Sequence, residues 1–96
     1  MSEHARIITV IPVYNGERYI RATLDSLAAQ TLRPDRVIVL DDASTDGTSQ
    51  LVEAYEPLDC ELIRSKKNEG LFKNFNQALS YATECDFLHY ICADDV

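Results

Sequence analysis

The chain of 96 residues is long enough for one small domain with a modest hydrophobic core. Its 46% hydrophobic and 26% charged residues are typical of a folded globular protein and argue against a disordered chain. The formal net charge of −7, from 9 basic and 16 acidic side chains, argues against a nucleic-acid partner. Because no apolar run reaches the ~18 residues of a membrane span, we expect no transmembrane segment.

Strand and helix patterns alternate along the sequence. Short apolar runs predict strands over 7–13, 36–40, 61–65 and 87–92. Apolar side chains at helical spacing predict helices over 17–30 and 72–83, and Ser44 or Thr45 is the expected N-cap of a helix that ends near Tyr55. This β-α-β-α-β-α-β order predicts an α/β fold, a Rossmann-like three-layer sandwich around a mostly parallel sheet.

Unusual polar residues follow the end of every predicted strand. In chain order they are Tyr14-Asn15, Asp41-Asp42, Asn68 to Gly70, and Asp94-Asp95. In open parallel sheets, ligands bind beyond the carboxyl ends of the strands, where the strand order reverses. The sequence therefore predicts a small-molecule site at one rim of the sheet.

The segment DASTDGTSQLVE, residues 42–53, also has the oxygen-ligand spacing of an EF-hand calcium loop. An EF-hand loop lies between two helices, whereas the residues before Asp42 have a strand pattern. The eighth position of such a loop is usually apolar, and here it is Ser49. A calcium module is therefore a marginal alternative.

The cysteines indicate a reducing compartment. Cys60, Cys85 and Cys92 are odd in number and form no CxxC pair, which argues against a zinc cluster or a disulfide framework. We expect reduced, mostly buried thiols. The N-terminal MSEHAR is not a signal peptide. The predicted location is cytoplasmic, with peripheral attachment to the inner membrane face as an option.

Four motifs in a fixed order give the sequence a family resemblance. They are VIPVYN at 10–15, DDASTDGT at 41–48, NEG at 68–70 with Asn76, and ADD at 93–95. Together they resemble the family 2 glycosyltransferases of the GT-A fold over nearly the whole chain. The resemblance implies transfer of a sugar from a nucleotide-sugar donor, usually with inversion at the anomeric carbon and with a divalent metal ion.

The resemblance also implies roles for residues that bind the nucleotide. Pro12 and Tyr14 match the turn that packs around the base. Asp42 matches the carboxylate that accepts a hydrogen bond from the base, typically from uracil N3–H, so a UDP-sugar is the expected donor. Gly70 belongs to the third motif and is expected in the same donor site.

The acidic pair Asp94 and Asp95 matches the residues that contact the ribose and a Mg²⁺ or Mn²⁺ ion, with Asp95 as the expected direct ligand. Such an ion would offset the charge of a diphosphate leaving group. The family often has a further acid two residues before Asp94, but here that residue is Cys92. A site with three carboxylates is therefore not expected.

In the family, the acceptor-binding half and the catalytic base would follow Val96. We therefore interpret residues 1–96 as the nucleotide-binding portion of a GT-A domain that contains no catalytic residue and is inactive alone. The acceptor, whether glycan, lipid or protein, cannot be read from these residues. An exposed sheet edge would favour self-association. The alternative is a non-catalytic nucleotide-binding or assembly module with the same fold.

Overall fold

The computed structural model describes residues 6–30, 34–66 and 76–91. Within these ranges, one sheet contains β1 (Ile7–Val13), β2 (Arg36–Asp41), β3 (Cys60–Arg64) and β4 (Phe87–Tyr90), all parallel. The strand order is β3-β2-β1-β4. The chain therefore builds outward from β1 to β3 and then returns to place β4 on the other side of β1. The reversal of strand order lies between β1 and β4.

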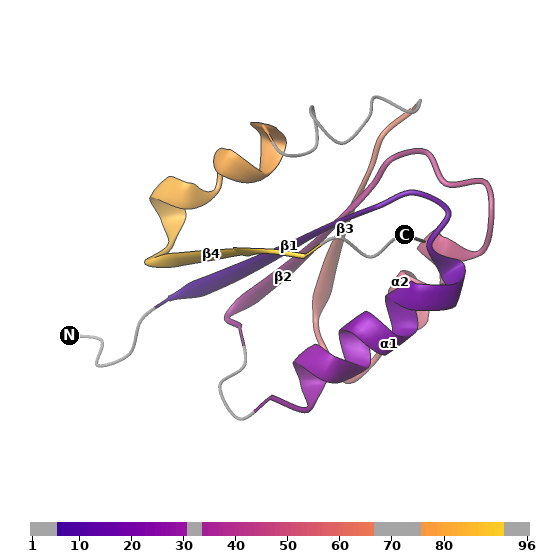
Figure 1. The fold of residues 1–96 in the computed structure, drawn as a ribbon, viewed down its shortest axis with the longest axis horizontal. Coiled ribbons are helices and arrows are strands. Elements are labelled where there is room, and N and C mark those ends of the chain that lie inside the picture. The colour runs from indigo at the N-terminus through magenta and orange to yellow at the C-terminus, as the bar shows by residue number, and fades with distance from the viewer. Residues whose placement is uncertain (1–5, 31–33, 67–75, 92–96) are drawn as a thin grey trace.

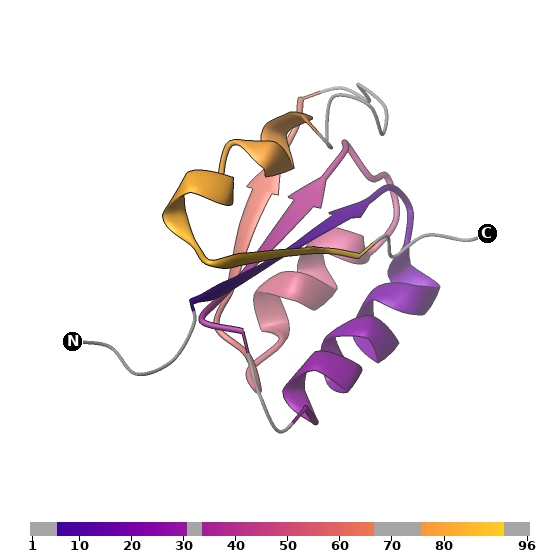
Figure 2. The same ribbon diagram turned by 60° about the vertical axis from the view of Figure 1, so that its left-hand side comes forward.

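Helical segments cover both faces of this sheet, as the sequence predicts. Helices α1 (Glu17–Ala28) and α2 (Thr48–Ala54) lie against one face. The helical residues 76–79 and the short 3₁₀ helix η1 (Ala82–Glu84) lie against the other, as Figures 1 and 2 show from two directions. The predicted three-layer α/β sandwich is confirmed.

Alternating side chains of β1 and β2 fill a core on each side of the sheet. Toward α1 and α2 point Ile11, Val13, Val37 and Val39, which pack with the helix residues Ile20, Leu24, Leu27 and Val52. Toward the opposite layer point Ile8, Val10, Ile38 and Leu40, which pack with Ala78. Because both faces of these strands are buried, their sequences read as continuous Val- and Ile-rich runs.

The start of α2 differs from the prediction. Ser44 and Thr45 are not N-caps, because the helix begins at Thr48 and its N-cap position is Gly47, without a side-chain cap hydrogen bond. The polar groups of Ser44 and Thr45 are instead hydrogen-bonded to Asn15, in the loop after β1. Ser, Thr, Asn and Asp are common both at helix N-caps and in loops held by side-chain hydrogen bonds. The sequence pattern therefore does not distinguish an N-cap from a loop contact.

Other element boundaries shift by a few residues. Helix α1 ends at Ala28 instead of residue 30, β2 extends to Asp41, and β3 begins and ends one residue earlier than predicted. Of the predicted helix 72–83, residues 72–75 lie outside the described residues, 76–79 are helical, and a turn and η1 follow. Strand β4 ends at Tyr90, and residue 92 of the predicted strand is not described.

Arg36 ties three elements together at the amino end of the sheet. It donates two hydrogen bonds of 2.8 Å to Glu61 of β3 and one of 3.0 Å to Glu84 of η1. Its guanidinium carbon also lies 5.6 Å from the ring centroid of Tyr81. The hydrogen bonds from Arg36 lower the pKa of the Glu61 carboxyl. This cluster fastens the helical segment to the strands at the end opposite the predicted site.

The cysteines are more accessible than predicted. Cys60 and Cys85 are free thiols and both are half-buried, since Cys60 begins the edge strand β3 and Cys85 lies in the connection before β4. Partial burial raises the pKa of the Cys60 thiol. Cys92 lies outside the described residues. Across the described ranges, no helix is both long and apolar enough to span a membrane.

Candidate functional site

The residues predicted to contact a nucleotide base lie at the carboxyl ends of β1 and β2. Pro12 is buried in β1, and Tyr14, which follows β1, is 42% exposed. Val10 accepts a hydrogen bond from Ile91 on the β4 side. In a parallel strand, the backbone hydrogen-bonding groups of successive residues point alternately to one neighbouring strand and to the other. The backbone of Pro12, two residues after Val10, therefore also points toward the β4 side. The described β1–β4 pairs stop at Val10, so the missing N–H of Pro12 breaks no described pair.

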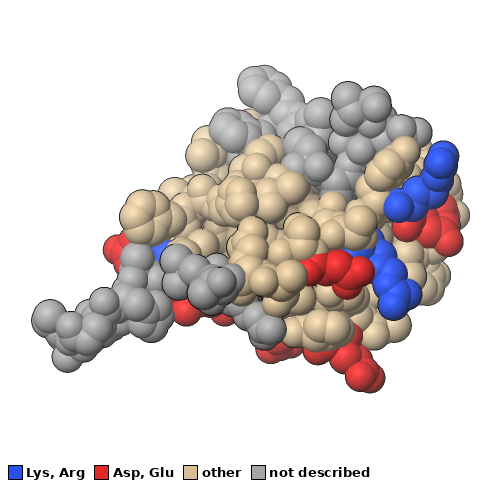
Figure 3. Space-filling model, turned by 60° about the horizontal axis from the view of Figure 1, so that its bottom comes forward, with Lys and Arg blue, Asp and Glu red and all other residues tan. Residues whose placement is uncertain are grey.

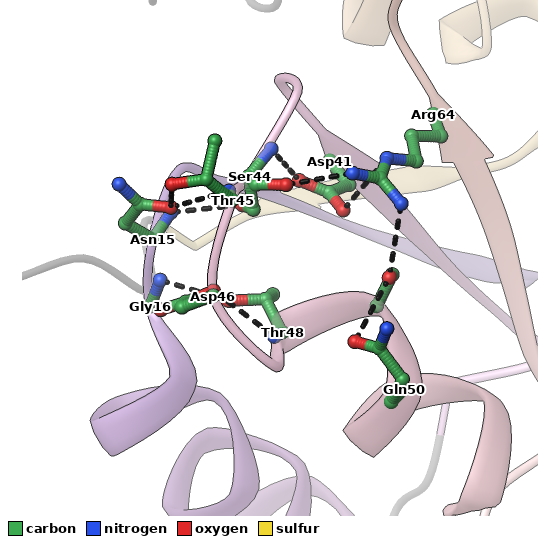
Figure 4. Close-up of polar contacts among 10 residues, drawn as sticks. Asn15, Gly16, Asp41, Ser44, Thr45, Asp46, Thr48, Gln50 and Arg64 are labelled. Atoms are coloured by element: carbon green, nitrogen blue, oxygen red, sulfur yellow. Dashed lines mark hydrogen bonds and ion pairs between the residues drawn. The ribbon is translucent and has the colours of Figure 1, made fainter.

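Hydrogen bonds join the loop after β1 to the loop after β2 (Figure 4). The Asn15 backbone N–H donates to Ser44 Oγ at 2.8 Å, and the Thr45 N–H donates to Asn15 Oδ1 at 2.8 Å. The Gly16 N–H donates to Thr48 Oγ1 at 3.1 Å. Asn15 has a φ of 50°, a left-handed conformation that asparagine tolerates better than most residues. The two loops therefore form one unit.

Glu17 makes hydrogen bonds with both Asp46 and Gly47 across the same junction. The Glu17 N–H donates to Asp46 Oδ2 at 3.2 Å, and the Gly47 N–H donates to Glu17 Oε1 at 2.9 Å. Asp46 Oδ1 accepts from both the N–H and the hydroxyl of Thr48. Burial works to raise the pKa of Asp46, and these hydrogen bonds together outweigh it, so the pKa lies below its ordinary value.

Gly47 permits this close approach of the two loops. A Cβ at this position would lie 3.0 Å from both Cδ and Oε2 of Glu17. Any larger residue would push the Glu17 carboxylate away from the Gly47 N–H. The glycine in the DGT segment is thus explained by the contact with α1 and not by a calcium loop. Strand β2, which precedes the segment, is also incompatible with an EF-hand.

Two adjacent carboxylates at the end of β2 are buried. Asp41 is 0% exposed and Asp42 is 2% exposed. Asp41 Oδ1 accepts a 3.0 Å hydrogen bond from the Ser44 N–H, and Asp41 Oδ2 lies 3.7 Å from Arg64 Nε. The Asp42 N–H donates to the Val13 carbonyl at 2.9 Å, which extends the β1–β2 ladder by one bond.

Arg64 was not predicted as a site residue from the sequence. This residue pairs with Asp41 in the β2–β3 register and also donates to the Ser44 carbonyl at 2.6 Å and to Ser49 Oγ at 3.2 Å. A signal was present: Val37, Val39 and Asp41 alternate on the face that α1 and α2 cover, so the Asp41 carboxylate points inward and needs a cation or donor.

Half of the predicted site residues are placed and half are not. Pro12, Tyr14 and Asp42 lie at the carboxyl ends of β1 and β2, and their predicted contacts with a nucleotide stay predictions. Gly70, Asp94 and Asp95 lie outside the described residues, so their roles stay predictions. Within the described ranges, no group of three His, Cys, Asp or Glu side chains is arranged to hold a metal ion.

A wide, shallow hollow of about 840 Å³ lies over the loop after β2 and the end of β3. Its lining residues are mostly polar and come from three segments: Ala43, Ser44, Thr45, Asp46, Gln50, Arg64, Ser65 and Lys66. A second hollow of about 250 Å³ lies between α1 and α2, where Tyr55 donates a 2.6 Å hydrogen bond to Asp25. That second hollow is lined by helix residues and the chain just after α2, away from the loops at the strand ends.

Acidic and basic side chains are interspersed on the face of the molecule that Figure 3 shows. In the view of Figure 3, the blue basic side chains lie beside red acidic ones, and no broad basic patch is visible. That a nucleic acid is not a partner stays a prediction from composition.

An open parallel sheet whose order reverses beside β1, with joined polar loops at the strand carboxyl ends, defines a Rossmann-like class of α/β protein. The family model described as "Glycosyl transferase family 2" matches residues 8–96, so the chain belongs to that family. This match confirms the predicted family, and the similar solved structures described next confirm its GT-A fold.

Curated relatives and solved structures support this assignment. Poly(ribitol-phosphate) β-N-acetylglucosaminyltransferase TarS of Staphylococcus aureus is 39% identical over 90 residues, which is 90% of this chain and 16% of TarS. A crystal structure of TarS residues 1–349 with UDP-GlcNAc matches with a TM-score of 0.81 and 37% identity, over 93% of this chain and 26% of that one.

A mannosyltransferase from Pyrobaculum calidifontis, in complex with GDP-Man and Mn²⁺, matches with a TM-score of 0.70 and 31% identity, over 84% of this chain and 25% of that one. The putative glycosyltransferase EpsE of Bacillus subtilis is 31% identical over 86% of this chain and 31% of its own length. The chain thus spans less than a third of the length of these relatives.

Proposed function

We propose that this chain is the donor-binding part of a glycosyltransferase that transfers a sugar from a UDP-sugar, with a divalent metal ion and with inversion at the anomeric carbon. The observation that carries the proposal is the hydrogen-bonded union of the β1 and β2 loops beside the point where strand order reverses. The similar structures hold UDP-GlcNAc and GDP-Man, which supports a nucleotide-sugar donor, and the TarS complex supports UDP as its nucleotide.

Two residues would recognise the base. Tyr14 is 42% exposed, so its ring is accessible to stack against a planar base. The buried Asp42 carboxylate can only accept hydrogen bonds while it is ionised. Uracil offers a donor at N3, whereas the otherwise similar cytosine has an acceptor there. The proposed contact therefore favours UDP over CDP.

The proposed metal site uses the acidic pair that follows β4. Asp94 and Asp95 supply adjacent carboxylate oxygens, which are the ligand type that Mg²⁺ and Mn²⁺ prefer, and Asp95 would be the direct ligand. When bound, the ion would offset charge on the diphosphate leaving group. This part of the proposal is based on the sequence motif.

Calorimetric titration of the chain with UDP, CDP and GDP, each with and without Mn²⁺, tests the proposal. We expect UDP to bind only with Mn²⁺ and at least about tenfold more tightly than CDP, since a mismatched buried acceptor costs at least ~1.4 kcal/mol. Asp95→Ala should abolish metal-dependent binding, and Asp42→Asn should remove the preference for UDP over CDP.

Asp59→Ala is the matched control, because Asp59 is an exposed acid just before the amino end of β3. This variant should bind UDP as the parent chain does. Metal-independent binding, equal affinity for UDP and CDP, or no binding by a chain that is folded by circular dichroism would each overturn the proposal.

A further inference from the structure

Ser44 is held through all three of its polar groups. Its N–H donates to Asp41 Oδ1 at 3.0 Å, its carbonyl accepts from Arg64 Nη2 at 2.6 Å, and its hydroxyl accepts from the Asn15 N–H at 2.8 Å. Each contact reaches a different segment: the end of β2, the end of β3 and the loop after β1. Ser44 is therefore the fixed point of the β2 loop.

The bond from the Ser44 N–H to Asp41 closes a small ring that contains Asp42 and Ala43. Ala43 has a φ of 63°, a conformation that alanine rarely adopts and keeps only where its surroundings enforce it. If the ring opened, the backbone at Ala43 would relax toward negative φ. Asp42 shares a peptide bond with Ala43, so its backbone would lose the constraint on that side and keep the bond from its N–H to the Val13 carbonyl.

Arg64 holds this ring from the outside. Its guanidinium reaches the Ser44 carbonyl, Ser49 Oγ of α2 at 3.2 Å, and Asp41 Oδ2 at 3.7 Å. In the described part of the chain, Asp41 Oδ2 is a buried oxygen without a hydrogen-bond partner, so this guanidinium is the group that faces it. The side chain of Arg64 is 49% exposed and lines the hollow over the loop after β2. Figure 4 shows the polar contacts of its guanidinium.

We propose that Arg64 is a positioning residue for nucleotide recognition: through Asp41 and Ser44 it fixes the turn that presents Asp42 to the base. The inference rests on the proposed function, because it concerns the same base site. It assigns Arg64 no contact with the nucleotide. An arginine suits this role better than lysine, because its planar fork serves three acceptors at once.

Titrations of Arg64→Ala and Asp41→Asn with UDP test the proposal. In titrations with UDP and Mn²⁺, we expect each variant to weaken binding about tenfold, since small displacements of a recognition group are costly. We expect the double variant to bind UDP no more than about tenfold more weakly than the parent chain, because both changes disrupt the same set of contacts around the turn. Arg64→Lys should fall between Arg64→Ala and the parent chain.

Lys66→Ala is the matched control. Lys66 lines the same hollow and carries the same charge, but it makes no described contact with the turn. We expect its UDP affinity to stay within about threefold of the parent chain, because removing one screened surface charge has a small effect. Weakening equal to that of Arg64→Ala would show that Arg64 acts through its charge and would overturn the proposal.

Amide hydrogen exchange tests the ring without any nucleotide. In Arg64→Ala, the Ser44 amide should exchange at least about tenfold faster, while amides within β2, such as Val39, keep the parental rate. Unchanged Ser44 exchange, or UDP affinity within twofold of the parent chain, would overturn the positioning role. If the parent chain fails to bind UDP, the proposed function falls, and the Ser44 result separately decides whether Arg64 holds the turn.

Discussion

Replacement of Asp46 should reveal how much the joined loops contribute to stability. Asp46 accepts three hydrogen bonds, two on Oδ1 from Thr48 and one on Oδ2 from the Glu17 N–H. Asp46→Asn keeps an oxygen for Thr48 but turns an amide donor toward the Glu17 N–H, so one bond is lost. At about 1 kcal/mol for each net bond, we expect a loss of about 1 kcal/mol for Asn and 2–3 kcal/mol for Ala.

Urea denaturation measures these losses. For a domain of this size, with an m value near ~1.2 kcal/mol/M, the Asp46→Ala change should lower the midpoint by roughly 2 M and the Asn change by roughly 1 M. Asp59→Asn, at an exposed acid outside the site, should leave the midpoint unchanged. An Asp46→Ala chain within about 0.5 kcal/mol of the parent chain would refute the reasoning, because three bonds cannot be worth so little together.

The same comparison should depend on pH. The pKa of Asp46 is lower in the folded chain than its ordinary value near ~3.9 in the unfolded chain. The ionised carboxylate therefore contributes stability that is fully present above pH ~4 and is lost as the pH falls through the folded pKa. The stability difference between the parent chain and Asp46→Asn should be constant from pH 7 to 5 and shrink by pH 3. A constant difference down to pH 3 would contradict the role of the charge.

Three further changes test the rest of the fold by the same urea assay. Asn15→Ala should cost about 2 kcal/mol, and Asn15→Gly about half of that, because glycine relieves the φ of 50° without restoring the bond from Thr45; equal losses would show that strain is unimportant. Leu27→Ala should cost about 3 kcal/mol, since Leu27 is fully buried in the core under α1. Arg36→Met should destabilise less than Leu27→Ala, and ~1 M NaCl should reduce its effect, because Arg36 acts through exposed ion pairs such as that with Glu61. A salt-independent loss would count against this.

The layered fold could be predicted from sequence because its cause is local in the chain. Strands β1 and β2 are buried on both faces, so each is a continuous apolar run, and α1 buries one stripe at helical spacing. The hydrogen bonds that join the loops could not be predicted, because Asn15 and Thr45 are 30 residues apart and nothing periodic relates them.

The candidate site was predicted in part for the same reason. Strand ends are visible in the sequence, so the rim that carries Tyr14 and Asp42 was found. The β2–β3 register, which sets Arg64 opposite Asp41, is a long-range pairing that no short motif records. The sequence therefore predicted no binding role for Asp41, although alternation along β2 places its side chain inside.

In the proposed function, the reversal of strand order beside β1 separates the base-recognition residue from the metal-binding motif. Asp42 reaches the rim from the β2 side of β1, whereas the acidic pair at 94–95 follows β4, on the other side of β1. Relatives that share β1 can therefore change one side without rebuilding the other. If the proposed function holds, base preference and metal preference are independent traits, so exchanging only the segment from β4 onward between two family members should transfer the second trait and leave the first in place.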